Sequence, residues 1–441
     1  LLLCLVASCF FYAWWDWRFL FLLGGSTLTG YVCGRLIHEA AEETRRKLWL
    51  WTSIGLHLGV LGVFKYYNFF IDSLIDALAL AGITVGIRTL EIILPVGISF
   101  YTFQTLSYTI DVYRRQIEPE PRLLNFSVFV SFFPQLVAGP IVRASTFLPQ
   151  LRAPRPWDQE RVILALEWIL WGFFLKLCIA DNAAVFVDSR YGDPDVYSPA
   201  SLTLATVFFA FQIYGDFAGY SLIAIGIAKL LGFDFGRNFN RPYFATGFSD
   251  FWGRWHISLS SWLRDYVYIP LGGGRGGFWH GARNAAITML LSGLWHGAGW
   301  TFLAWAALHA LYLFAERVIG MVLTPRWWTR AAALPLVFAL TCLAWVFFRA
   351  ATMEEALTIL QTILTWTAEP GASFGAQRLL AAKIACLIVF AVVADALSAR
   401  EGVMRWYRGS LLLRAAGAGG LIAMIALTGA FGANQFIYFQ F

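Results

Sequence analysis

The sequence predicts an all-α protein that crosses a membrane many times, and three features support this prediction. Of its 441 residues, 59% are apolar and only 14% are charged, whereas a soluble domain carries about 25% charged residues. The mean hydropathy is +0.63. Charge-poor runs long enough to cross a bilayer recur along the chain. This composition excludes a soluble multidomain enzyme, a nucleic-acid-binding protein and a disordered scaffold.

Each apolar run is expected to form a membrane-embedded helix, because about 20 apolar residues span the hydrocarbon core. In chain order the runs are residues 1–15, 19–34, 48–70, 92–110, 123–142, 161–180, 196–228, 284–315, 331–348, 379–397 and 415–441. They amount to roughly ten or eleven embedded segments. No soluble domain interrupts them, so the prediction is a single membrane-embedded domain over 1–441.

Two of these runs do not fit one simple helix. Residues 284–315 would reach about 48 Å as one helix, and Gly293, Gly297 and Gly299 cluster in the run. Residues 123–142 contain two prolines, which break helices. Each run is therefore predicted to bend or to re-enter the membrane. Irregular backbone at this depth is tolerated where it lines a cavity enclosed by protein.

The charge and the cysteines of the chain indicate where its loops and its thiols lie. The net charge is +6, which we assign to cytoplasmic loops and an anionic ligand. The loops at 38–47 and 111–122 are rich in arginine and are placed in the cytoplasm. The six cysteines form no C-x-x-C pair and lie in apolar runs, so they are expected to be buried thiols. Because the chain opens inside an apolar run without methionine, we expect an N-terminal piece to be missing.

The segment 233–283 differs from the rest, because it is rich in both arginine and aromatic residues. Its centre, Asp250 to Val267, has the periodicity of an amphipathic helix, with His256 at the edge of the apolar face. Two interpretations remain open. The helix lies in the headgroup layer, or it enters the protein and presents His256 to a cavity.

His296 and Asp216 are ionisable residues inside apolar runs, where charge is costly and often functional. Imidazole has a pKa suited to proton transfer near neutral pH. Glycines flank His296 and permit close approach. The alternative for His296 is a small-residue helix contact with a hydrogen bond across it. Asp216 is expected to orient a substrate, to pair with an arginine or to be a buried structural acid. A serine hydrolase has little support, because no G-x-S-x-G elbow occurs.

Several stretches of the chain resemble the membrane-bound O-acyltransferase superfamily, and in particular its branch for bacterial alginate O-acetylation. They are FFPQLVAGPIVR (132–143), YGDFAGYSLIAIGIAKLLGF (214–233), NFNRPYFATGFSDFWGRWHISLSSWLRDYVYIPLGG (238–273), LLSGLWHGAGWTF (290–302) and FIYFQF (436–441). The resemblance covers nearly the whole chain. It implies about a dozen transmembrane and re-entrant helices around a tunnel.

The resemblance also implies the catalytic residues. The histidine of the W-H-G stretch is His296, and the second polar residue of the family maps to His256, 40 residues upstream. Acyl transfer to a hydroxyl needs a base and donors to the developing oxyanion. His296 is expected to act as the base or to carry the acetyl group transiently, and both mechanisms stay open. Further candidates for substrate or donor binding are Arg254, Arg241, Asn240, Arg264, Asp265, Asp216 and Trp295.

By resemblance, the protein is an O-acetyltransferase of the bacterial inner membrane. It would take acetyl groups from acetyl-CoA, with no metal or bound cofactor. It would pass them to an exported polysaccharide such as alginate, through a periplasmic or membrane-anchored SGNH-type transferase. Three alternatives remain: transfer of D-alanine with a carrier protein, a polysaccharide transporter, and a non-catalytic scaffold. A transporter is expected to show an internal repeat, and none is visible in the sequence.

Overall fold

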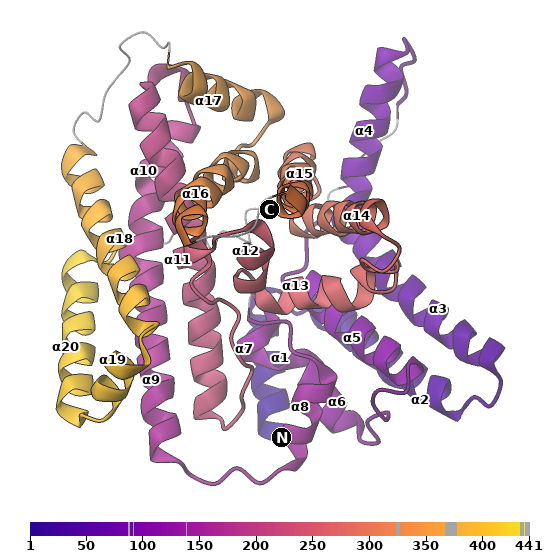
Figure 1. The fold of residues 1–441 in the computed structure, drawn as a ribbon. Coiled ribbons are helices and arrows are strands. Elements are labelled where there is room, and N and C mark those ends of the chain that lie inside the picture. The colour runs from indigo at the N-terminus through magenta and orange to yellow at the C-terminus, as the bar shows by residue number, and fades with distance from the viewer. Residues whose placement is uncertain are drawn as a thin grey trace. The chain divides into compact units, whose positions relative to one another are not determined.

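The computed structural model describes residues 1–441 except 87–88, 91, 138, 323–326, 367–376, 433–435 and 437–441. Every regular element of these described residues is a helix, as Figure 1 shows. Among the described residues, eight helices are long and apolar enough to cross a membrane: Phe19–Glu39, Glu43–Leu80, Gln159–Tyr191, Pro199–Leu230, Trp300–Met321, Thr329–Arg349, Arg378–Ser398 and Leu411–Thr428. The predicted all-α, multi-pass membrane fold is confirmed.

The chain divides into two compact units. The first comprises Leu1–Asp158 with Ala228–Gly236, and the second comprises Gln159–Ile227 with Arg237–Phe441. Each is described by itself. The single membrane-embedded domain expected from the sequence stays a prediction.

The first unit is built on three mutually packed helices, α2, α3 and α5 (Figure 1). Its helices are α1 (Leu2–Asp16), α2 (Phe19–Glu39), α3 (Glu43–Leu61), η1 (Gly62–Tyr66), α4 (Tyr67–Leu80), α5 (Ile98–Tyr113), α6 (Leu123–Ser131), α7 (Phe133–Leu136) and α8 (Ala144–Arg152). The run 123–142 is broken as predicted. It divides between α6 and α7 at Phe132, and Pro134 lies in the first turn of α7, where a missing amide hydrogen costs little.

The second unit holds the polar-aromatic segment and both proposed catalytic histidines. Its helices are α9 (Gln159–Phe173), η2 (Phe174–Ala180), α10 (Asp181–Tyr191), η3 (Pro194–Val196), α11 (Pro199–Leu230, ending in the first unit), η4 (Pro242–Phe244), α12 (Phe248–Arg254), α13 (Ile257–Leu263), η5 (Arg264–Tyr268), α14 (Phe278–His296), α15 (Trp300–Val322), α16 (Trp327–Arg349), α17 (Met353–Thr365), α18 (Arg378–Ser398), α19 (Glu401–Arg408) and α20 (Leu411–Thr428).

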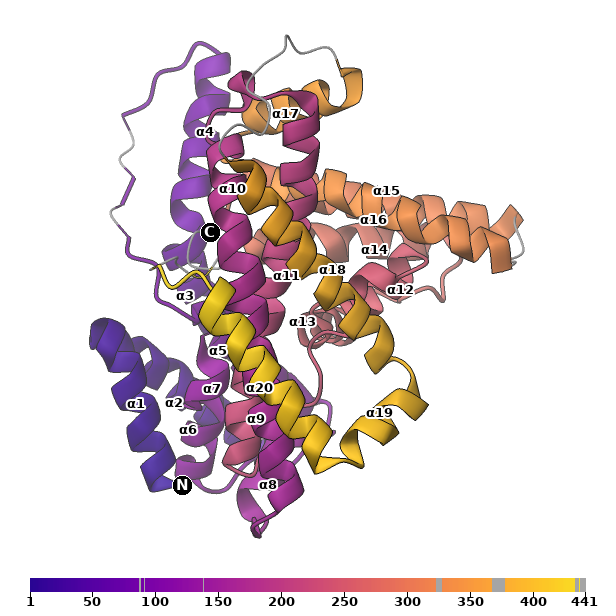
Figure 2. The ribbon, with the colours of Figure 1, turned by 90° about the vertical axis from the view of Figure 1, so that its left-hand side faces the viewer.

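A continuous helix formed by α9, η2 and α10 is the spine of the second unit. Figure 2 shows α18 and α20 running beside it, in agreement with their packing against η2, α9 and α10. Glycines let α11 approach the same spine. A Cβ on Gly172 would lie 2.6 Å from the carbonyl oxygen of Gly219, so neither position has room for a side chain. The core is strongly aromatic and includes the fully buried Trp255, Trp305 and Trp345.

The long run 284–315 folds as a helical hairpin, which confirms the predicted break. Helix α14 ends at His296, α15 begins at Trp300, and Gly297 and Gly299 lie in the turn. Helices α14 and α15 pack closely along their length. A Cβ on Gly293 would lie 2.6 Å from the Phe302 carbonyl oxygen, so this glycine sets the distance between the two helices.

Two expectations differ from the structure. The single amphipathic helix predicted from Asp250 to Val267 is wrong, because α12 ends at Arg254 and α13 begins only at Ile257. The cysteines form no disulfide among the described residues, but they are not all buried: Cys386 is exposed on α18. An exposed apolar thiol is compatible with a helix surface that faces lipid. The final run, 415–441, is helical to Thr428, and Phe436 is the only described residue of FIYFQF.

Candidate active site

His256 and His296 lie together in the interior of the second unit. Their ring centroids are 6.2 Å apart, with an angle of 57° between the ring planes. His256 is fully buried and His296 is 3% exposed. The predicted candidate Trp295 lies beside both rings, 5.6 Å from His256 and 5.0 Å from His296. Two residues 40 positions apart in sequence therefore form one imidazole pair.

His256 occupies an unusual backbone conformation. It lies between α12 and α13 with φ 42° and ψ 55°, in the left-handed region. Residues other than glycine rarely adopt this region, and strain of this kind is concentrated at functional sites. This residue interrupts the predicted helix and turns the His256 ring inward. The ring packs edge-on against Phe217, with 4.5 Å between centroids. Of the two interpretations of this segment, the burial of Trp255 and His256 favours a segment that enters the protein.

The segment around Asn238 holds the strained residue on both sides. The amide of Ile257 donates to the Asn238 carbonyl at 2.8 Å, and the amide of Asn240 donates to the Arg254 carbonyl at 2.9 Å. These two backbone bonds flank His256. They supply the tertiary constraint that a left-handed histidine requires.

The side chain of Asn238 also forms hydrogen bonds with two neighbouring helices. Its Oδ1 accepts from the Ser258 amide at 3.2 Å and from the Ser258 hydroxyl at 2.8 Å. Its Nδ2 donates to Ser221 Oγ on α11 at 3.0 Å. Asn238 is 1% exposed, so these bonds form where water does not compete.

The environment of His256 keeps its imidazole neutral. Burial lowers the pKa of His256 to about 3, because a charged ring is poorly solvated in an apolar interior. No residue of the described chain makes a hydrogen bond to either ring nitrogen of His256. Both nitrogens therefore remain available to a substrate or to a proton transfer within the pair.

His296 ends α14 and is enclosed by aromatic rings. Trp305 of α15 lies 5.2 Å away and Phe348 of α16 lies 5.3 Å away, both edge-on. The hairpin turn that follows has no space for a side chain at Gly297, because a Cβ there would overlap the Phe302 ring. This packing fixes the imidazole on a rigid element, as catalysis requires.

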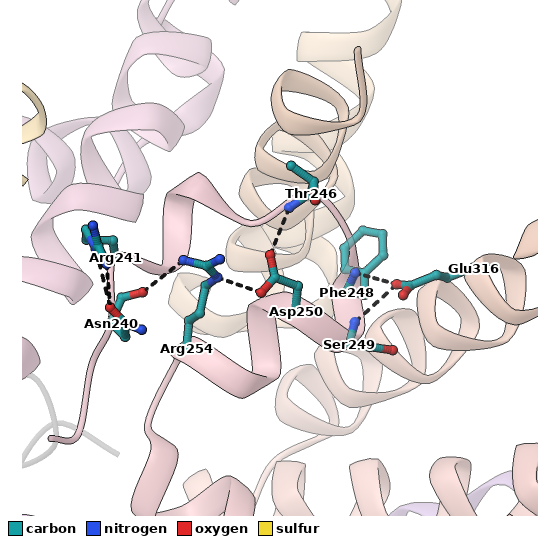
Figure 3. A network of polar contacts seen from close by, with 8 residues as sticks. All are labelled: Asn240, Arg241, Thr246, Phe248, Ser249, Asp250, Arg254 and Glu316. Carbon is teal, nitrogen blue, oxygen red and sulfur yellow. Dashed lines mark hydrogen bonds and ion pairs between the residues drawn. The ribbon is translucent and has the colours of Figure 1, made fainter. Parts of the chain in front are cut away.

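A polar network holds the first residues of α12, at the end of the helix away from His256 (Figure 3). Glu316 of α15 accepts from the amides of Phe248 and Ser249, the first amides of α12. This carboxylate caps the helix from a distant part of the chain. Asp250 accepts from the Thr246 amide at 3.2 Å.

Figure 3 also places three of the predicted donor-binding residues. Arg254 forms an ion pair with Asp250 at 2.6 Å and donates to the Asn240 carbonyl at 3.5 Å. Arg241 donates to Asn240 Oδ1 at 3.2 Å. It has φ 50° and lines a small cavity with Tyr214 and Asp395. In this structure these side chains form hydrogen bonds and ion pairs within the protein.

The remaining predicted residues are also paired. Arg264 binds its neighbour Asp265 at 2.7 Å. Asp216 contacts Lys176 Nζ at 2.6 Å, and the same ammonium contacts Asp181 at 2.8 Å. Asp216 thus pairs with a lysine of η2 instead of an arginine. Among the described residues no cluster of three His, Cys, Asp or Glu side chains could hold a metal ion.

Sequence reasoning missed Asn238 and Glu316, which hold the strained segment. Asn238 lies in the NFNRP stretch that carried the resemblance, but nothing in the sequence shows which groups it bonds. His309 is a further buried imidazole in the same unit. It is fully buried between Trp252 and Trp305, with centroids 5.1 and 5.0 Å away, and no described residue hydrogen-bonds its ring.

A multi-pass helical protein with two buried imidazoles at one site belongs to the class of membrane proteins equipped for acid–base or nucleophilic chemistry. Comparison with known proteins identifies the family. The model of the MBOAT, membrane-bound O-acyltransferase, family matches residues 115–354. The chain belongs to the membrane-bound O-acyltransferase family and is an acyltransferase.

Curated relatives match most of the chain. A probable alginate O-acetylase of Pseudomonas aeruginosa is 40% identical over 373 residues, which cover 83% of this chain and 70% of that protein. A peptidoglycan O-acetyltransferase of Helicobacter pylori is 35% identical over 384 residues, 81% of this chain and 72% of that protein. A teichoic acid D-alanyltransferase of Streptococcus thermophilus is 28% identical over 249 residues, 52% of this chain and 57% of that protein. The first two names support O-acetyl transfer here.

Proposed function

We propose that this protein transfers acetyl groups from a thioester donor on the cytoplasmic side of the membrane to a polysaccharide outside it, with His296 and His256 as its catalytic residues. The observation that carries the proposal is the buried pair itself, two imidazoles with centroids 6.2 Å apart. Similarity to enzymes named for alginate and peptidoglycan O-acetylation supports acetyl as the group transferred and a polysaccharide as the acceptor.

In the proposed reaction His296 is the general base. Its unprotonated imidazole nitrogen accepts the proton of an acceptor hydroxyl while the hydroxyl oxygen attacks the thioester carbonyl carbon. The tetrahedral intermediate then expels the thiolate as the carbon–sulfur bond breaks. The thiolate receives the proton from the His296 imidazolium. The products are an O-acetyl ester and a free thiol, and no proton is gained or lost overall.

His256 is proposed to act as a neutral partner of His296. A neutral imidazole has one N–H donor and one acceptor nitrogen, so it stabilises the developing oxyanion or orients the His296 ring. The low pKa of His256 suits both roles, because this ring does not compete for the transferred proton. The competing mechanism is an acetyl group carried briefly on a His296 nitrogen.

The aromatic enclosure supports transfer over hydrolysis. Trp305 and Phe348 pack against His296, and Trp345 packs behind them against both rings. All three are at most 1% exposed. A site that excludes water protects a thioester from hydrolysis. It also strengthens each electrostatic contact to the oxyanion.

We further propose that the protein resides in a bacterial inner membrane and works with an SGNH-type transferase outside the membrane. The protein would move the acetyl group across the bilayer, and the partner would complete its transfer to the polymer. Enzymes named for different polymers have similar identities to this chain, 40% and 35%. The acceptor is therefore proposed as a polysaccharide class and not as one polymer.

The test uses membranes that contain the protein with its partner, supplied with radiolabelled acetyl-CoA. Label is counted on polysaccharide and on protein, for wild type, His296→Ala and His256→Ala. We expect His296→Ala to abolish label on polysaccharide and His256→Ala to reduce it at least tenfold. Label trapped on wild-type protein and lost in His296→Ala supports the acetyl-histidine mechanism.

The exposed His38 offers a matched control. His38→Ala should transfer acetyl groups at the wild-type rate, and all variants should insert in the membrane at equal levels. Transfer that persists in both His296→Ala and His256→Ala would reject the catalytic assignment.

A second candidate function is D-alanyl transfer, favoured by the similarity to the teichoic acid enzyme of Streptococcus thermophilus. That similarity covers 52% of the chain, against 83% for the alginate O-acetylase. The same membranes supplied with D-alanine on a carrier protein distinguish the two. Label transferred from the carrier and not from acetyl-CoA would select D-alanyl transfer.

A further inference from the structure

A glycine-rich loop precedes α14 at the opposite end of that helix from His296. Its sequence from Leu271 to Gly277 is LGGGRGG, and three of its glycines, Gly272, Gly273 and Gly277, have φ between 58° and 105°. Side chains disfavour such angles, so the loop needs glycine there. The amides of Gly272, Gly273 and Arg275 donate to backbone carbonyls within the turn. The amides of Gly274, Gly276 and Gly277 make no such backbone bond among the described residues, and loops that bind anions present amides of this kind.

Arg317 of α15 is built into this loop. A Cβ at Gly281, in the first turn of α14, would lie 2.9 Å from Arg317 Nη2, and one at Gly274 would lie 3.4 Å from it. A Cβ at Gly274 would also lie 3.5 Å from the Tyr268 hydroxyl oxygen. The guanidinium therefore rests between the helix and the loop, in space that exists because both positions are glycine.

This guanidinium has no acidic partner. Within the described parts of the chain, neither Arg317 nor Arg275 makes a hydrogen bond or an ion pair. Arg283 donates to the amide oxygen of Asn284. The nearby carboxylates are already used, because Asp265 pairs with Arg264 and Glu316 caps α12.

The neighbouring arginines with carboxylate partners give a contrast. Arg254 binds Asp250 and Arg264 binds Asp265, so their charges are balanced locally. Arg275 belongs to the glycine loop and Arg317 packs against it, and neither binds a carboxylate among the described residues. An anion with several oxygens satisfies such a set better than a single carboxylate, because each guanidinium offers paired N–H donors.

We propose that Arg317, Arg275 and the amides of Gly274, Gly276 and Gly277 bind the phosphate groups of a phosphorylated ligand. Resting on the proposed function, that ligand is the thioester donor. Gly281 and His296 are 15 residues apart on α14, which is about 22 Å at 1.5 Å per residue. A donor with phosphates at one end of an extended arm and a thioester at the other spans this length. A lipid headgroup presents the same phosphate chemistry, and the experiment separates the two sources.

The test measures binding of coenzyme A by purified wild-type protein in nanodiscs of zwitterionic lipid. Pantetheine, which lacks the phosphates, is the comparison ligand. Arg317→Gln removes the charge, and Gly281→Ala leaves the arginine but occupies its space. Arg330→Gln is the control, because it makes the same charge change at an exposed position of α16.

We expect coenzyme A affinity to fall about tenfold or more in Arg317→Gln and in Gly281→Ala. Arg330→Gln should match wild type, and pantetheine should bind all four proteins equally. Equal coenzyme A affinity in wild type and Arg317→Gln would overturn the proposal for the donor. The phosphate site then stands only if phosphatidylglycerol co-purifies with wild type and is lost in Arg317→Gln. If neither ligand responds to Arg317→Gln, the site itself is rejected.

Acetyl transfer measured on the same preparations separates this inference from the proposed function. If His296→Ala abolishes transfer and Arg317→Gln changes neither binding nor transfer, the phosphate site fails and the acetyltransferase stands. If Arg317→Gln weakens coenzyme A binding but wild type transfers no acetyl group, the phosphate site stands and the proposed function fails. Equal unfolding temperatures of the variants exclude misfolding as the cause.

Discussion

Asn238 Oδ1 accepts two hydrogen bonds from Ser258, one from its amide at 3.2 Å and one from its hydroxyl at 2.8 Å. The pair ties the first turn of α13 to a loop outside the helix. His256 lies immediately before that turn, in the left-handed conformation. The position of an imidazole at the proposed site therefore depends on an amide that does not touch it.

Replacement of this amide should lower turnover more than substrate affinity. We expect Asn238→Ala to reduce kcat about tenfold or more with little change in KM, because a displaced His256 disturbs the transition state before it disturbs binding. Loss of the buried bonds should also cost about 1–3 kcal/mol of stability.

Ser221→Ala provides the matched control for this prediction. It removes the partner of Asn238 Nδ2 but leaves the bonds to α13. Steady-state acetyl transfer should show near-normal kcat for Ser221→Ala. Equal kcat losses in the two variants would mean that Asn238 acts through general stability and does not position His256.

The stability of the protein should depend on pH through His256. The pKa of His256 is about 3 in the folded protein and about 6.5 in an unfolded chain. Between these values the unfolded state binds a proton that the folded state does not, so stability decreases as pH falls from 6.5 towards 3. The slope is at most about 1.4 kcal/mol per pH unit.

His256→Gln isolates this contribution, because glutamine does not titrate. Unfolding midpoints in detergent, measured at pH 7 and pH 5, should fall further on acidification for wild type than for His256→Gln. If the unfolding midpoints of the two proteins fall equally between pH 7 and pH 5, His256 takes up a proton in the folded state.

Lys176 should be essential for the stability of the second unit. It contacts two buried carboxylates, Asp181 at 2.8 Å and Asp216 at 2.6 Å. Lys176→Met leaves both carboxylates without this cation, and removal of one partner of a buried ion pair costs about 3–5 kcal/mol.

The double variant Lys176→Met/Asp216→Asn should recover part of this loss, since it removes one carboxylate charge as well. Thermal unfolding and the amount of monodisperse protein measure both variants. If Lys176→Met is as stable as wild type, the two carboxylates are neutral or solvated without the lysine.

The sequence allowed some features of the site to be predicted, because they depend on local chemistry. Glycines within the run 284–315 predicted a bend or re-entrant piece, which the structure shows as the α14–α15 hairpin. The family stretches identified His296 and His256 as candidates. The break of the helix at His256 was not predictable from periodicity, because residues 250–267 keep a helical pattern across it. What imposes the break is a set of bonds from Asn238 and Asn240.

Long-range partners explain the other differences. Glu316 caps α12 from 68 residues away, and Asp216 meets Lys176 across two helices. Neither pairing leaves a signal in a single sequence, since many acids and bases are available to each group. The arginines illustrate the same point: the sequence grouped Arg241, Arg254 and Arg264 as donor-binding candidates, whereas the structure shows which arginines have acidic partners.

The spacing of α14 and α15 should be sensitive to one methyl group. A Cβ at Gly293 would lie 2.6 Å from the Phe302 carbonyl oxygen and 2.7 Å from Ala306 Cβ. Backbone and a short side chain cannot move aside, so Gly293→Ala must push the helices apart. We expect a stability loss of about 1–3 kcal/mol.

Because His296 lies one turn beyond Gly293 on the same helix, activity should fall along with stability. Gly320→Ala on α15 is the matched control: no atom lies within 4 Å of its Cβ, and alanine favours the helix by up to about 1 kcal/mol. Unfolding temperature and acetyl transfer should decrease in Gly293→Ala and hold or rise in Gly320→Ala. If Gly293→Ala kept full activity and stability, the two helices would have to separate without moving His296, and the rigid hairpin would not be what positions the proposed base.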